Sequence, residues 1–194
     1  ERETFGLVGE SGCGKSATCR AIARLLPENG RIMNGSITFR GRELVDLRER
    51  DMIAVRGSGI GMIFQEPMTA LNPVLTIETQ LMETMRGQGL GKRQMRERAI
   101  ELLRLVDITE PENRLKQYIH QFSGGMRQRA MIAIALAAKP EVLLADEPTT
   151  ALDVTIQQQI ITLIKRLKRE LGMSVVLVTH DLGVVRMMCD RVAV

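Results

Sequence analysis

A short run near the start of the sequence has the residue types and the spacing of a phosphate-binding loop. The segment Gly9-Glu10-Ser11-Gly12-Cys13-Gly14-Lys15-Ser16 fits the pattern G-x-x-x-x-G-K-[S/T]. Glycines allow successive backbone N–H groups to wrap around one anion, and a following helix adds the positive end of its dipole. Lys15 would bring a point charge to the β- and γ-phosphates of a nucleotide, and Ser16 would offer its hydroxyl to Mg²⁺.

A glycine-rich turn with a surface lysine is the alternative explanation for this run. It is disfavoured because an apolar strand is expected directly before the loop and a helix directly after it. We therefore expect a nucleotide to contact the whole loop and the start of the helix. The expected contacts are Gly9, Glu10, Ser11, Gly12, Cys13, Gly14, Lys15, Ser16 and Ala17.

Two carboxylates follow another apolar run, Val142 to Ala145. In a parallel sheet, ligands collect at the carboxyl ends of the strands. Asp146 suits a magnesium ligand there, and Glu147 could accept a proton from an attacking water. Two loop acids that cap a helix are the alternative, which is open for the pair alone and disfavoured once the phosphate loop is considered.

Gln65 and His180 also follow apolar runs, Ile60 to Phe64 and Val175 to Val178. A neutral amide could orient a water or join the Mg²⁺ shell, and a histidine could donate a hydrogen bond to a γ-phosphate oxygen. Spacing alone supports neither role, because a single histidine is more often structural and a single glutamine carries little information.

A second candidate anion site opens a later helix. Phe122-Ser123-Gly124-Gly125-Met126 precedes the helical pattern of residues 128–138, and a serine with two glycines at a helix start suits an anion. A plain N-cap explains the same residues equally well. If Ser123, Gly124 and Gly125 do bind a phosphate, the sequence leaves open which nucleotide carries it.

The expected elements place these residues at the edge of a parallel sheet. Apolar runs alternate with helical patterns, which is typical of a parallel sheet covered on both faces. Strands are expected at 4–8, 36–40, 60–64, 142–145 and 175–178, the second of them in a small antiparallel element. Helices are expected after the phosphate loop up to Leu26, at least twice within 76–106, over 128–138, and from Ile156 to Leu171 with Gly172 as C-cap.

Composition narrows the function classes. The 194 residues carry 44% hydrophobic and 26% charged residues, a net charge of +4 and a pI near 9.3, as in a folded domain with basic residues dispersed among acidic ones. An aromatic content of 3% without tryptophan argues against a single-strand nucleic-acid platform. The three cysteines show no metal or disulfide spacing, which favours a reducing compartment. The chain starts without Met and stops inside an apolar run, so we expect the central part of a longer polypeptide.

Together these motifs resemble the nucleotide-binding subunit of an ATP-binding-cassette (ABC) transporter, over essentially the whole chain. Gly9 to Ser16 is similar to the Walker A loop and Gln65 to the Q-loop glutamine. Val142 to Glu147 is similar to Walker B with its catalytic glutamate, and His180 to the switch histidine. Two further matches complete the set: Ser123-Gly124-Gly125 to the family signature and Ala151-Leu152-Asp153 to the D-loop. Met126 stands where the signature commonly has Gln.

The resemblance implies a P-loop NTPase (RecA-like) α/β fold with a parallel sheet core, an inserted α-helical subdomain and a partial antiparallel β element. We expect one domain over 1–194, with the core over about 1–65 and 140–194 and the helical insertion over about 66–139. The implied catalytic residues are Lys15, Gln65, Glu147 and His180, and the implied Mg²⁺ ligands are Ser16, Gln65 and Asp146. The ligands would be ATP and Mg²⁺.

The resemblance also implies partners and a location. Two such subunits would pack head to tail, as a homo- or heterodimer, so that the signature of one meets the γ-phosphate bound by the other. The segments 62–73 and 122–129 are similar to bacterial importers of dipeptides, oligopeptides and nickel. The expected partners are permease subunits, with an extracytoplasmic solute-binding protein contacted indirectly and no nucleic acid, at the cytoplasmic face of the inner membrane. Two alternatives remain: a soluble ABC-type ATPase acting on the ribosome or DNA, and a small-molecule kinase.

Overall fold

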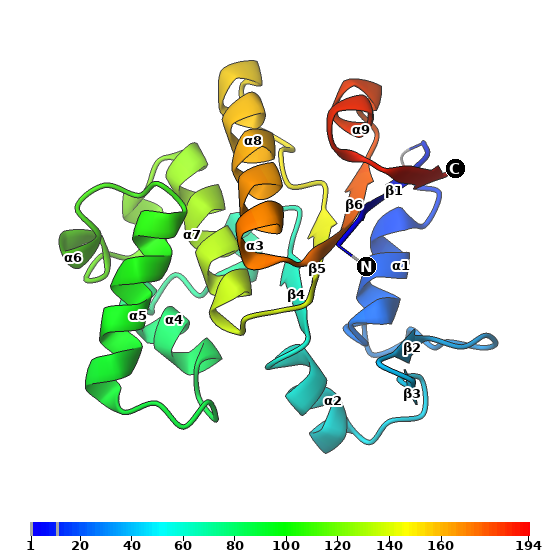
Figure 1. The fold of residues 1–194 in the computed structure, drawn as a ribbon, viewed down its shortest axis with the longest axis horizontal. Helices are drawn as coiled ribbons and strands as arrows, with labels where there is room; N and C mark the ends of the chain where they lie inside the picture. The colour runs from blue at the N-terminus through cyan, green and yellow to red at the C-terminus, as the bar shows by residue number, and fades with distance from the viewer. Residues whose placement is uncertain (1, 11) are drawn as a thin grey trace.

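A parallel sheet forms the centre of the molecule (Figure 1). The computed structural model describes residues 2–10 and 12–194. The five-stranded sheet has the order β4-β5-β6-β1-β7, and every neighbouring pair in it is parallel. Its strands are β1 (Thr4–Val8), β4 (Ile60–Ile63), β5 (Val142–Asp146), β6 (Ser174–Thr179) and β7 (Arg191–Ala193). The predicted α/β fold with a parallel sheet is confirmed.

A small antiparallel pair and a series of helices complete the structure. The pair is β2 (Thr38–Phe39) and β3 (Arg42–Glu43), which confirms the predicted antiparallel element in shorter form. The helices before β4 are α1 (Lys15–Ile22) and α2 (Glu49–Arg56). Between β4 and β5 lie α3 (Pro67–Ala70), α4 (Ile77–Thr84), α5 (Lys92–Leu105), α6 (Pro111–Arg114), the 3₁₀ turn η1 (Ile119–Gln121) and α7 (Gly124–Ala137). After β5 come α8 (Val154–Leu171) and α9 (Leu182–Met188).

Alternate side chains of the strands enter two different hydrophobic clusters. Leu143 and Ala145 of β5 are fully buried against α7 and α8, whereas Leu144 between them is buried with residues of α1 and α2. Successive strand side chains point to opposite faces, so this alternation means that both faces of the sheet are covered. The continuous apolar runs of the sequence are explained by this double burial.

The strand register brings three strand ends to one level. Asp146 of β5 lies opposite Val178 of β6, and Val8 of β1 lies opposite Thr179 of β6. The residues that follow these ends, Gly9, Glu147 and His180, therefore emerge at the same edge of the sheet. In Figure 1 this is the upper edge, where α1, α7 and α8 also begin.

The predicted extension of the first helix to Leu26 is wrong. Helix α1 ends at Ile22, because Arg24 turns into the left-handed region with φ 51° and the Leu25 N–H donates to Arg20 O at 2.7 Å. This turn closes the helix without a glycine. Helix α7 begins at Gly124, earlier than the predicted residue 128, and helices α2, α3, α6 and α9 were not predicted.

Candidate functional site

The loop between β1 and α1 has the backbone that its glycines allow. Gly12 and Gly14 adopt φ of 85° and 96°, in the left-handed region that other residues avoid. At Gly9 a Cβ atom would lie 2.7 Å from Sγ of the exposed Cys13, so a side chain there would require the cysteine to move. Ser11, also predicted to contact a nucleotide, lies outside the described residues.

Lys15 lies under this loop and is buried, with 6% of its surface exposed. Its ammonium group donates hydrogen bonds to Gly9 O at 2.8 Å and Glu10 O at 2.6 Å, and it lies 3.6 Å from Cys13 Sγ. The side chain thus spans the loop and holds its positive charge beside the loop's own carbonyl oxygens.

The N-terminus of α1 is open toward this loop. Its N-cap residue is Gly14, and no side chain caps the helix. The first amides of a helix have no intrahelical partner, and together with the helix dipole they favour an anion. Ser16 and the exposed Ala17 belong to this first turn, so both predicted contacts lie where an anion would bind.

Asp146 connects the sheet to this helix. The Ser16 hydroxyl donates to Asp146 Oδ1 at 2.7 Å, and the Asp146 side chain is fully buried. The other oxygen, Oδ2, is buried without a hydrogen-bond partner among the described residues. Burial raises the pKa of Asp146, and this outweighs the opposing effects of the Ser16 hydrogen bond and the nearby Arg20 and Lys15 charges.

Glu147 contacts the two remaining predicted catalytic residues, Gln65 and His180. Its Oε2 accepts hydrogen bonds from Gln65 Nε2 at 3.0 Å and from Thr150 Oγ1 at 2.9 Å. Its Oε1 lies 3.3 Å from Nδ1 of His180, a contact between a largely buried carboxylate and an exposed imidazole. Residues from the ends of three strands therefore converge on a single carboxylate.

The charge on Glu147 is favoured by these contacts. Burial raises its pKa, but the hydrogen bonds from Thr150 and His180 and the electrostatic effects of His180 and Lys15 outweigh burial. The net pKa lies below the ordinary value of a glutamate, so the ionised form that could accept a proton is the stable form at neutral pH.

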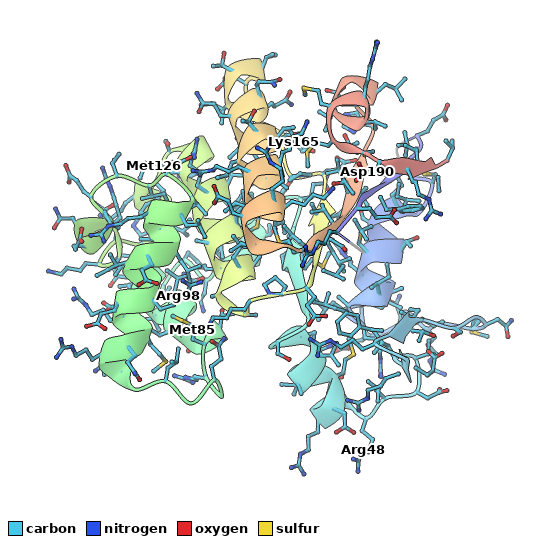
Figure 2. All side chains as sticks on the ribbon, viewed as in Figure 1. Arg48, Met85, Arg98, Met126, Lys165 and Asp190 are labelled. Carbon is cyan, nitrogen blue, oxygen red and sulfur yellow. The ribbon has the colours of Figure 1, made fainter. Side chains whose placement is uncertain are left out.

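Ser123, Gly124 and Gly125 lie apart from this cluster, at the start of α7. Ser123 is exposed and its Oγ accepts from Met126 N at 3.4 Å, a long N-cap hydrogen bond. Figure 2 shows Met126 at the upper end of α7, on the opposite flank of the sheet from α1. Gly125 faces α8, since a Cβ atom on it would lie 3.0 Å from Ile156 Cγ2, whereas Gly124 faces Leu152 in the loop before α8.

The structure thus groups the predicted residues into one cluster around the phosphate loop and one separate helix start. Sequence reasoning missed the Thr150 contact with Glu147. Within 2–10 and 12–194, no three His, Cys, Asp or Glu side chains are grouped to hold a metal ion. None of the helices in that part of the chain is long and apolar enough to cross a membrane.

Comparison with protein families and known proteins gives consistent results. A family model described as ABC transporter matches residues 1–150. The chain is 55% identical over 194 residues to the probable peptide ABC transporter ATP-binding protein y4tR of Sinorhizobium fredii, covering 99% of this chain and 58% of that protein. It is 54% identical to the dipeptide transport ATP-binding protein DppD of Bacillus subtilis, with the same coverage of 99% and 58%. The chain therefore spans a little over half the length of these relatives.

Solved structures share the fold. The dimeric, post-hydrolysis ATP-binding cassette MJ0796 bound to ADP and Pi superposes with a TM-score of 0.82 at 34% identity, covering 97% of this chain and 79% of that chain. CbiO1 of Clostridium perfringens, part of the ABC transporter complex cbiONQ, gives a TM-score of 0.82 at 28% identity over 98% of this chain and 72% of that chain.

Proposed function

This chain belongs to the ABC transporter family, and from that premise we propose that it binds ATP with Mg²⁺ and hydrolyses the ATP to drive transport. The observation that carries the proposal is the 2.7 Å hydrogen bond from Ser16 Oγ to Asp146 Oδ1. This bond joins an uncapped helix start, where phosphates would bind, to a buried carboxylate at a strand end. Anion-binding amides and a cation ligand are thereby adjacent, as a magnesium–nucleotide complex requires.

The phosphate loop fits a nucleotide's phosphates. A side chain at Gly9 would have to displace Cys13 Sγ, and the left-handed glycines Gly12 and Gly14 turn the backbone around the start of α1. We propose that Gly9 to Ala17 bind the phosphates, with Lys15 moving its ammonium group from the carbonyl oxygens of Gly9 and Glu10 to the phosphate oxygens.

Asp146 and Ser16 fit Mg²⁺. The ion prefers hard oxygen ligands and usually combines one or two carboxylates with phosphate oxygens and water, so no cluster of three acidic residues is needed. The buried Asp146 Oδ2 without a protein partner is the kind of atom that such an ion would satisfy. We propose that Asp146 and Ser16 hold the ion, with Gln65 joining its shell. Bound Mg²⁺ would neutralise charge on the phosphate oxygens.

In the proposed reaction, Glu147 takes a proton from a water molecule while the water oxygen bonds to the γ-phosphorus. The bond from the γ-phosphorus to the bridging oxygen breaks, and ADP and phosphate leave. Lys15 compensates the charge on the phosphate oxygens. Gln65 orients the Glu147 carboxylate, and His180, whose Nδ1 lies 3.3 Å from that carboxylate, would donate a hydrogen bond to a γ-phosphate oxygen.

The separate position of Ser123, Gly124 and Gly125 supports a dimer. We propose that these residues bind the γ-phosphate held by the loop of a second ATP-binding subunit, a homologous or an identical one. The dimeric state of MJ0796, to which this chain is similar, supports this arrangement. The division into a RecA-like core over about 1–65 and 140–194 and a helical insertion over about 66–139 also remains a proposal.

The names of the relatives support peptides as the class of transported solute. Because several of them are peptide, dipeptide or oligopeptide transport ATP-binding proteins, we propose that the whole protein powers uptake of peptides, with nickel as the alternative solute. Its partners would be permease subunits at the cytoplasmic face of a bacterial inner membrane. A solute-binding protein would contribute indirectly, and no nucleic acid would take part.

Purification of the tagged full-length protein from its own cells tests the transport assignment. Co-purification of two membrane permeases, and loss of peptide uptake when Lys15→Ala replaces the native chain, are the expected results. Co-purification with ribosomes or DNA, together with normal peptide uptake in the Lys15→Ala strain, would favour the soluble ABC-type ATPase instead.

A further inference from the structure

Thr150 contacts the carboxylate that the proposed reaction depends on. Its hydroxyl donates to Glu147 Oε2 at 2.9 Å, compared with 3.0 Å for the Gln65 amide on the same oxygen. The contact from His180 to the other oxygen is longer, at 3.3 Å. Among the three partners Thr150 is the one that belongs to the same loop as the carboxylate.

The backbone of this loop is folded so that the hydroxyl returns to the carboxylate. Glu147 has φ 45° and Ala151 has φ 63°, both in the left-handed region that side chains disfavour. The Thr150 N–H donates to Glu147 O at 3.2 Å, which closes a turn between the two residues. A further hydrogen bond, from Gln157 Nε2 of α8 to Thr149 O at 3.2 Å, holds the turn against the next helix.

We propose that Thr150 is a positioning residue for hydrolysis, whose hydroxyl fixes the orientation of the Glu147 carboxylate toward the attacking water. The inference rests on the proposed role of Glu147 as general base. A carboxylate bonded at both oxygens by donors from three elements has one orientation. Without the Thr150 hydroxyl, Oε2 keeps a single donor, the flexible amide of Gln65, and the carboxylate gains freedom to rotate.

The segment after Thr150 also contacts the start of α7. A Cβ atom on Gly124 would lie in ordinary van der Waals contact, 3.6 Å from Leu152 Cδ2. Asp153 then caps α8, its Oδ1 accepting from Ile156 N at 2.9 Å. Thr150 therefore belongs to the segment that joins Glu147 to the proposed second phosphate site, and among the described residues its side chain has no hydrogen bond to the phosphate loop or to Lys15. We therefore expect the loss of the Thr150 hydroxyl to lower the rate of hydrolysis and to leave the affinity for ATP unchanged.

Two substitutions separate the hydroxyl from the shape of the side chain. Thr150→Val keeps the branched shape and removes the hydroxyl, whereas Thr150→Ser keeps the hydroxyl. For the full-length protein we expect Thr150→Val to lower kcat by roughly ten- to hundredfold, because a hydrogen bond to a charged group is lost. The KM for ATP should stay within about twofold. Thr150→Ser should restore kcat to within about threefold of the wild type.

A binding measurement and a matched control complete the test. Titration with a fluorescent ATP analogue should give the same affinity for the wild type and both Thr150 variants. Thr162→Val, which removes a hydroxyl that donates to Gln158 O on α8, should leave kcat unchanged. Thermal unfolding checks that Thr150→Val is folded, and Thr150→Ala replaces it, with the same expectations, if it is not.

The outcomes distinguish this inference from the proposed function. Normal kcat in Thr150→Val, a rise in KM without a fall in kcat, or a failure of Thr150→Ser to restore the rate would overturn the positioning role. Glu147→Gln is measured beside these variants. If Glu147→Gln is inactive while Thr150→Val is fully active, only the inference about Thr150 fails. If Glu147→Gln is itself fully active, the proposed role of Glu147 fails.

Discussion

Two helices of this molecule begin in glycine-rich segments at the same edge, and their surroundings differ. Helix α1 follows Gly14 without a capping side chain, and the buried Lys15 and Asp146 adjoin its first turn. Helix α7 follows Ser123, which is exposed and caps its own helix through a 3.4 Å hydrogen bond. The start of α1 therefore has a cation and carboxylates supplied by its own chain, whereas the start of α7 presents a serine and two glycines.

We interpret the two helix starts as complementary parts of one phosphate site: the α1 half, with Lys15 and Asp146, and the α7 half, with Ser123, Gly124 and Gly125. The start of α1 adjoins the charged groups, Lys15, Asp146 and Glu147, that we propose bind phosphate and magnesium and activate water. The start of α7 has the amides and hydroxyl for an anion, without a charged group of the described chain bonded to them. We infer that the α7 start acts on a phosphate that another subunit holds, and each substitution below changes one half and leaves the other intact.

The largest expected effect is on the α1 half. Lys15→Ala removes the buried positive charge of the loop, so nucleotide binding at micromolar ATP should be abolished. Equilibrium titration with a fluorescent ATP analogue measures this directly. The exposed Lys116 provides the control, because Lys116→Ala should bind like the wild type. Unchanged binding by Lys15→Ala would show that the loop is not the phosphate site.

The second substitution, also in the α1 half, distinguishes ATP binding from ATP hydrolysis. Glu147→Gln keeps the size and the hydrogen-bonding shape of the side chain but removes the base, so turnover should fall at least about a hundredfold while ATP binding is retained. Phosphate release and nucleotide titration on the same preparation measure the two quantities. Near-normal turnover would remove Glu147 from its proposed role.

Mixing two inactive variants tests whether the halves belong to different subunits. Ser123→Ala should bind ATP normally and lose at least about tenfold in turnover, because only the second half is altered. In a mixture with Lys15→Ala, heterodimers would contain one intact pair of halves, Lys15 from one chain and Ser123 from the other. Partial recovery of activity, above the sum of the separate variants, is the expected result. If both halves acted within one chain, the mixture would show no gain.

The smallest effect concerns the helix caps themselves. The cap of α7 is long, at 3.4 Å from Ser123 Oγ to Met126 N, whereas Asp153 caps α8 at 2.9 Å. Loss of a cap typically costs about 1 kcal/mol, and a long hydrogen bond belongs at the low end of that range. Ser123→Ala should therefore lower the free energy of unfolding by less than Asp153→Ala, as measured by urea denaturation. A larger loss at Ser123 would indicate that this serine is mainly structural.

The sequence was sufficient for the residues that follow strand ends. Gly9 and Asp146 come directly after apolar runs and His180 one residue after another, and parallel strands bring such positions to one edge. The start of α7 was predicted too late, because the helical pattern was recognised only from residue 128, whereas Ser123 caps a helix that begins at Gly124. The roles of these residues are not settled by their positions and remain proposals.

Other features depended on backbone turns that have no local signature. Helix α1 stops early because Arg24, a residue that normally continues a helix, enters the left-handed region. Thr150 reaches Glu147 only because Glu147 and Ala151 adopt the same unusual conformation. A positive φ at residues other than glycine or asparagine follows from tertiary contacts, so neither turn could be predicted from residue type.

The most direct test is a crystal structure of the chain with Mg²⁺ and a non-hydrolysable ATP analogue. The account predicts that the amides at the start of α1 enclose the terminal phosphates, with Lys15 Nζ moved from Gly9 O to a phosphate oxygen and Mg²⁺ beside Ser16 and Asp146. An analogue bound elsewhere, or a loop whose amides point away from the phosphates while Lys15 keeps its contacts to Gly9 and Glu10, would contradict it.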